Sequence, residues 1–126
     1  GELEKLMNQI KENNELLKKG NEILGTLRRY KYGGRNTPPP GDITGFFTEN
    51  DISMPDAGQG TDLLDADWDA YINSLEEYIN TISDMSQMDM LRLQQLMSKQ
   101  NQMIQTFSNI MKKQSETSDD IIDNMK

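Results

Sequence analysis

The spacing of apolar residues near the start of the chain is the feature that most restricts how this sequence can fold. Over residues 2–30, apolar side chains recur alternately three and four residues apart. A repeat that averages about 3.5 residues keeps one stripe of a helix facing a partner helix along its whole length. The spacing predicts a coiled-coil helix at 1–31, with Asn13 in register on its seam and the apolar seam residues Leu3, Leu6, Ile10, Leu17 and Leu24.

A second helical pattern begins after residue 61 and continues to residue 126. This stretch contains no proline and no glycine, so no residue in it forces a helix to break. The apolar stripe shifts phase at residues 84–89. We therefore expect a long helix at 62–126, either continuous or kinked near 84–89, with the seam residues Trp68, Ile72, Leu75, Ile79, Leu93, Met97, Ile104, Phe107 and Met111.

The segment between these helices, 32–61, has a different composition. It contains all four prolines, and Pro38 to Pro40 favour an extended spacer over a helix. Two adjacent phenylalanines nevertheless indicate local structure. We expect a short helical turn or hairpin that packs Ile43, Phe46 and Phe47 onto the helices. The whole pattern predicts an all-α fold, namely two long helices in an antiparallel coiled-coil hairpin with a partly ordered, Pro/Gly-rich connector.

Composition excludes many kinds of chemistry. The chain of 126 residues has neither histidine nor cysteine, which removes disulfides, thiolate nucleophiles, structural zinc sites and Ser-His catalysis. Residues 36–91 carry twelve acidic residues and no basic one, a charge that repels nucleic-acid phosphates. No apolar run approaches the ~20 residues of a transmembrane helix. We expect no enzyme activity, no cofactor, no nucleic-acid partner and no transmembrane segment.

One acidic pattern resembles a calcium-binding loop. Asp65, Asp67, Asp69 and Glu76 occupy positions 1, 3, 5 and 12 of an EF-hand-like sequence. Position 6, where the loop needs a glycine, is Ala70. Acidic residues at the start of a helix also cap its free N–H groups, and this interpretation explains the same residues. We expect no metal site.

Methionine is abundant in the last third of the chain, which holds seven of the nine methionines. Flexible methionine side chains suit surfaces that adapt to partners, although they also fill ordinary helical cores. The apolar stripes after residue 61 exceed what one N-terminal helix can cover. The sequence therefore predicts that another subunit, or further sequence, covers part of them.

The order of these parts resembles a known family. Residues 40–47 (PGDITGFF), with Asn-Asp-Ile-Ser at 50–53, and the Met/Gln/Asn-rich stretch 64–112 are similar to segments of the hydrophilic needle-tip and filament proteins of type III secretion systems, the EspA, SseB and IpaD group. In that family a long antiparallel coiled coil brackets a variable insert. The chain lacks the large globular insert that some members carry.

The resemblance implies a secreted virulence protein of a bacterial surface appendage. Such a protein is a structural translocator component that self-associates and supports translocon assembly. Its partners would be the secretion needle subunit and translocator proteins, or a cognate chaperone. Two alternatives remain open: a helical secretion chaperone or adaptor that binds a client helix on its Met-rich face, and a minor pilus subunit of a type IV secretion system.

Overall fold

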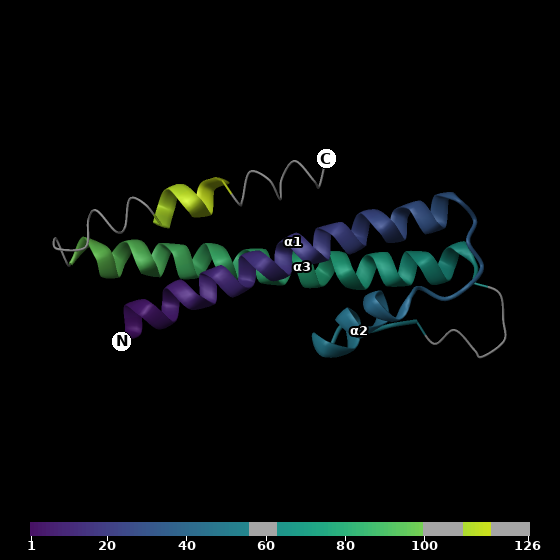
Figure 1. The fold of residues 1–126 in the computed structure, drawn as a ribbon, viewed down its shortest axis with the longest axis horizontal. Helices are drawn as coiled ribbons and strands as arrows, with labels where there is room; N and C mark the ends of the chain where they lie inside the picture. The colour runs from purple at the N-terminus through teal and green to yellow at the C-terminus, as the bar shows by residue number, and fades with distance from the viewer. Residues whose placement is uncertain (56–62, 100–109, 117–126) are drawn as a thin grey trace. The chain divides into compact units, whose positions relative to one another are not determined.

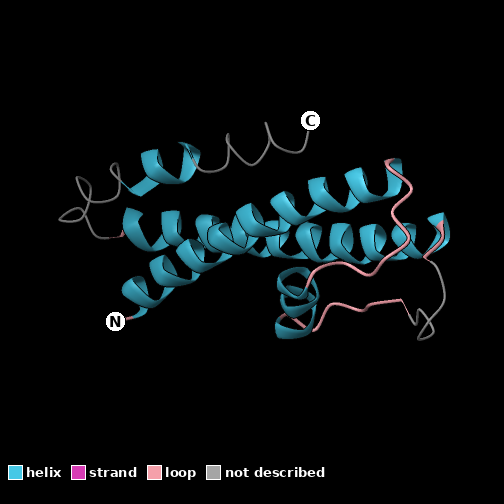
Figure 2. Cartoon of the chain, turned by 45° about the vertical axis from the view of Figure 1, so that its right-hand side comes forward, coloured by secondary structure: helices cyan, strands magenta, loops and turns pink. Residues whose placement is uncertain are grey.

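All regular secondary structure in the described part of the chain is helical. A computed structural model describes residues 1–55, 63–99 and 110–116, and no strand occurs among them. The helices are α1 (Glu2–Tyr32), α2 (Gly41–Glu49) and α3 (Asp65–Ser98), and 110–116 form a further helical segment (Figure 1; Figure 2). The predicted all-α class is confirmed for these residues.

The chain divides into two compact units. The first contains Gly1–Asn21 and Thr81–Lys126, and the second contains Glu22–Asn80. Both long helices contribute to both units, since the boundary falls within α1 and within α3.

The first unit has an apolar core built from α1 and α3. Leu6 and Ile10 of α1 pack with Leu93 and Met97 of α3. Around this cluster lie partly buried apolar side chains, and one of them, Ile110, comes from the segment 110–116. The others are Leu3, Met7, Met90 and Leu96. The segment 110–116 of the same chain therefore covers part of the apolar surface that we expected another subunit or further sequence to cover.

The long C-terminal helix is shorter than predicted. α3 passes through 84–89 without a break but ends at Ser98, and Lys99 is a turn residue. The Ser98 hydroxyl donates to the Gln95 carbonyl at 2.8 Å, and the Lys99 N–H donates to the Leu96 carbonyl at 3.3 Å. Both hydrogen bonds join residues i and i−3, in place of the i to i−4 bonds of an α-helix. The serine hydroxyl competes with a backbone N–H for the carbonyl oxygen.

The second unit is organised around aromatic side chains. Phe47 of α2 meets Tyr71 of α3 edge to face at 5.5 Å between ring centroids, and Phe46 meets Tyr78 in the same way at 6.0 Å. The ring centroids of Trp68 and Tyr71 lie 5.7 Å apart. The contacts of Phe46 and Phe47 hold α2 against α3. The connector contains a helix, Gly41–Glu49, and not a hairpin.

Two helices in this unit end in the same backbone motif. After α1, the Arg35 N–H donates to the Tyr30 carbonyl at 3.0 Å, and Gly34 has φ +68°. After α2, the Ile52 N–H donates to the Phe47 carbonyl at 2.8 Å, and Asp51 has φ +54°. This is the Schellman motif, which satisfies the last helical carbonyls and turns the chain away from the helix.

Candidate functional site

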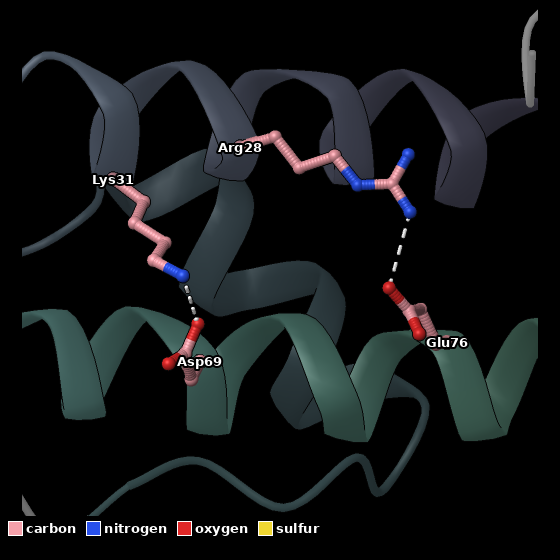
Figure 3. A network of polar contacts seen from close by, with 4 residues as sticks. All are labelled: Arg28, Lys31, Asp69 and Glu76. Atoms are coloured by element: carbon pink, nitrogen blue, oxygen red, sulfur yellow. Dashed lines mark hydrogen bonds and ion pairs between the residues drawn. The ribbon is translucent and has the colours of Figure 1, made fainter.

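Ion pairs join α1 to α3 in the second unit. Arg28 pairs with Glu76 at 3.1 Å, and Lys31 pairs with Asp69 at 2.7 Å. Figure 3 shows both basic side chains reaching from α1 toward the carboxylates of α3. The hydrogen bond and charge of Asp69 raise the pKa of Lys31. Because all four side chains are largely exposed, solvent screens both ion pairs and each adds little to stability.

An open depression of about 510 Å³ lies beside these pairs. It is lined by Arg28, Lys31, Tyr32, Asp65, Asp69 and Ile72. Its charged side chains include both signs, and the Lys31 cation is already paired within it. The depression therefore offers no concentrated charge of one sign to an anionic or a cationic ligand.

The four acidic residues of the calcium-like pattern do not form a loop. All four belong to the continuous helix α3, where they are spread along more than three turns. Asp69 and Glu76 pair with Lys31 and Arg28, and the Asp67 carboxylate accepts the Leu64 N–H at 2.8 Å. Within the described ranges no group of three or more acidic side chains could hold a metal ion. The acids act at the helix N-terminus and in ion pairs.

The connector residues expected to pack are all in the core. Ile43, Phe46 and Phe47 are buried in α2. Arg35, which no sequence pattern marks, contacts both neighbouring helices from the connector. Its carbonyl accepts the Trp68 indole N–H at 2.8 Å, and its guanidinium lies 4.3 Å from the Tyr30 ring centroid. No spacing rule signals this contact, because it joins residues 33 positions apart.

Two tyrosines of the aromatic cluster have altered acidity. Burial raises the pKa of Tyr71, and the nearby charge of Asp67 adds to the effect. Burial also raises the pKa of Tyr78, whose hydroxyl donates to the Asn50 side-chain carbonyl at 3.1 Å. Both rings pack in the aromatic cluster, Tyr71 against Phe47 and Trp68 and Tyr78 against Phe46.

Most of the predicted seam residues are buried within the chain itself. Leu3 and Met111 are half-buried, while Ile104 and Phe107 lie outside the described residues. The buried seam residues are Leu6, Ile10, Leu17, Leu24, Trp68, Ile72, Leu75, Ile79, Leu93 and Met97. These residues pack in cores within the chain, so they are not exposed to a second subunit.

Asn13 makes a polar contact between the two long helices. It is half-buried, and its side-chain amide donates to the Asp89 carboxylate of α3 at 3.4 Å. Asn14 and Asn21 are the buried side-chain amides of α1, and each has a side-chain atom with no hydrogen-bond partner among the described residues.

A row of apolar side chains is exposed on α3. Met85, Met88 and Leu91 are 48%, 69% and 59% exposed, and they recur every three residues. We call these three residues the exposed row. All three lie in the first unit, and they are out of phase with Leu93 and Met97. The methionine count pointed to this helix, but the seam pattern did not select these positions.

Comparison with known proteins identifies no relative of this chain. No family model, no curated protein and no solved structure matches the chain. Among residues 1–55, 63–99 and 110–116, no helix is long and apolar enough to cross a membrane.

Proposed function

We propose that this chain is a structural component of a bacterial type III secretion appendage, a needle-tip or filament subunit that self-associates and supports translocon assembly. The observation that carries the proposal is the exposed row on α3. Three neighbouring apolar side chains on one helix face favour burial against a partner. The role is structural rather than catalytic.

The contacts within each unit support an antiparallel hairpin of α1 and α3. In the second unit, Arg28 pairs with Glu76, whereas the later residue Lys31 pairs with the earlier residue Asp69. The residue numbers therefore run in opposite directions along the two helices. An antiparallel coiled coil of this kind is the framework that the resemblance implies.

In the first unit the same two helices meet near their other ends. Glu2 pairs with Arg92, and Asn13 donates to Asp89. Here too, the later residue of α1 meets the earlier residue of α3. The pairing supports the proposed hairpin in this unit as well.

Sedimentation velocity over a wide range of protein concentration tests the proposal. A structural subunit is expected to form larger species as concentration rises, and electron microscopy of the same samples should show tips or filaments. Binding to a purified needle subunit is the second expected result. A folded chain that stays monomeric at millimolar concentration and binds no needle subunit would contradict the proposal.

The exposed methionines also favour one other function, a secretion chaperone or adaptor. Met85 and Met88 are flexible side chains that can adapt to a client helix. A chaperone would form a complex of fixed stoichiometry with one client and would not form filaments. Sedimentation of the chain with and without candidate client helices separates the two functions.

A further inference from the structure

The methionine thioethers are the groups of this chain that react most readily with a peroxide. The chain has no cysteine, so no thiol competes with them for an oxidant. The described methionines of α3 differ widely in exposure. Met88 is 69% exposed and Met85 is 48% exposed, whereas Met97 is only 3% exposed. Because oxidation requires access to the sulfur, these side chains differ in reactivity.

The helical spacing explains why the exposures differ. Met97 belongs to the apolar core of the first unit, and Met90 packs against that core. Met88 precedes Met97 by about two and a half turns of α3, so the two side chains lie on opposite faces of the helix. The fold therefore protects one set of thioethers and presents the other to solvent.

We propose that Met85 and Met88 are a site of reversible oxidation by hydrogen peroxide, and that their oxidation weakens self-association of the chain. In this reaction the O–O bond of the peroxide breaks, and one oxygen atom forms a bond to the thioether sulfur. The other oxygen leaves as water with both hydrogens of the peroxide. The sulfur loses two electrons and becomes a sulfoxide, and the peroxide gains them.

Oxidation changes the property of the exposed row on which self-association depends. A sulfoxide is polar and hydrogen-bonds to water, so its burial against a partner costs free energy. Leu91 has no sulfur, and it stays apolar as the third member of the row. This inference rests on the proposed function, because a sulfoxide weakens association through this row only if self-association buries it.

The fold is expected to survive oxidation of the row, because neither side chain lies in the core. Met97 is the opposite case, since a sulfoxide there would place a polar oxygen within the core of the first unit. Exposure also makes the change reversible. A methionine sulfoxide reductase returns the thioether while two thiols are oxidised to a disulfide and the oxygen leaves as water.

Tandem mass spectrometry of the folded chain during treatment with hydrogen peroxide tests the site. Met85 and Met88 should be oxidised at least about tenfold faster than Met97. In urea the rates should converge, because the unfolded chain no longer shields Met97. Equal rates in the folded chain would overturn the assignment of the site.

Sedimentation equilibrium before and after peroxide treatment tests the effect on association. The association constant should fall by about tenfold once both methionines of the row are oxidised. Methionine sulfoxide reductases with dithiothreitol as the thiol should restore the constant. Circular dichroism shows whether the oxidised chain is folded.

The control variants change which sulfurs can react. The double variant Met85→Leu with Met88→Leu removes both sulfurs from the row and keeps every other methionine. Its association constant should change by less than about twofold on treatment, relative to the same variant before treatment. Met54→Leu is the matched control, because Met54 is 41% exposed but lies in the second unit. It should respond to peroxide as the wild type does.

The possible failures can be told apart. If Met85 and Met88 are oxidised first but association of the folded chain is unchanged, the regulation is wrong while the proposed function stands. If the untreated chain stays monomeric at every concentration and binds no needle subunit, the proposed function and its regulation fail together. The oxidation rates decide the site in either case.

Discussion

At the scale of single residues, backbone conformation at the helix ends decides which substitutions are tolerated. Gly34 and Asp51 occupy the same position of the Schellman motif and both have positive φ. Glycine adopts this conformation without steric cost, whereas a side chain costs about 1–2 kcal/mol and somewhat less for aspartate. The chain thus has a suitable residue at one helix end and a strained one at the other.

We expect Asp51→Gly to raise the free energy of unfolding by about 0.5–1 kcal/mol, because it removes this strain. Gly34→Ala should lower it by about 1 kcal/mol. A Cβ at Gly34 has nothing within 4 Å, so the loss would come from backbone conformation alone. Urea unfolding followed by circular dichroism measures both changes.

Gly45→Ala is the matched control for these variants. A Cβ at Gly45 also has nothing within 4 Å, but this glycine lies inside α2 and has no positive φ. Alanine there should stabilise the helix by up to about 1 kcal/mol. Equal effects of Gly34→Ala and Gly45→Ala would contradict the account of the helix ends.

Titration of the buried tyrosines predicts a loss of stability at alkaline pH. The pKa values of Tyr71 and Tyr78 are raised above the usual 10.0 in the folded chain. The unfolded chain therefore releases these protons first as pH rises, and stability falls from about pH 10 upward through the folded pKa values. The raised pKa of Lys31 acts in the same direction above 10.5.

The melting temperature should fall as the pH rises above about 10, and less steeply in the Tyr71→Phe variant. That variant keeps the ring and removes the titrating hydroxyl. Tyr32→Phe is the control, because the Tyr32 side chain is 97% exposed. A pH profile of Tyr71→Phe identical to that of the wild type would show that burial of this phenol contributes nothing.

At the scale of helices, α2 is held by a few large side chains. Phe47 is fully buried and its ring meets Tyr71, and the N–H of the buried Ile52 donates to the Phe47 carbonyl. Phe47→Ala removes a whole ring from this site. We expect it to lower the free energy of unfolding by about 3–5 kcal/mol, with the greatest loss of amide-exchange protection in α2.

Thr48→Ala is the control for Phe47→Ala. Thr48 is exposed, and its hydroxyl donates only to the Thr44 carbonyl of the same helix, at 3.0 Å. Its loss should change stability by no more than about 0.5 kcal/mol. Similar effects of the two variants would mean that α2 does not depend on the aromatic contact.

The spacing of apolar residues predicts much of the extent of these helices. Where the prediction fails, a physical cause can be named. The leucine spacing predicts a helix at 1–31, where α1 extends from Glu2 to Tyr32. The end of α3 at Ser98 was missed, since neither proline nor glycine marks it. At that end the Ser98 hydroxyl competes for the Gln95 carbonyl, and a pattern of apolar and polar residues does not reveal such competition.

The candidate surface was harder to predict than the core. A seam pattern finds residues such as Leu93 because they repeat in phase with the partner helix. Met85 and Met88 belong to no sustained repeat, so only their exposure in the folded chain distinguishes them from core methionines such as Met97. Arg35 was missed because its contacts depend on how the connector folds back.

At the scale of the whole molecule, the residues that pack the chain differ from those proposed to mediate association. Most of the described seam residues are buried within the chain, whereas the exposed row is the surface proposed for a partner. The central claim is therefore that association can be removed without loss of the fold. Met88→Glu places a charge in the exposed row, whereas Leu93→Ala opens a cavity in the core of the first unit.

Sedimentation equilibrium of these two variants, paired with their melting temperatures, separates the exposed row from the core. Met88→Glu should be monomeric with a melting temperature close to that of the wild type. Leu93→Ala should melt at a lower temperature but still associate while it is folded. The claim would be contradicted if Met88→Glu associated as wild type does and folded Leu93→Ala were monomeric.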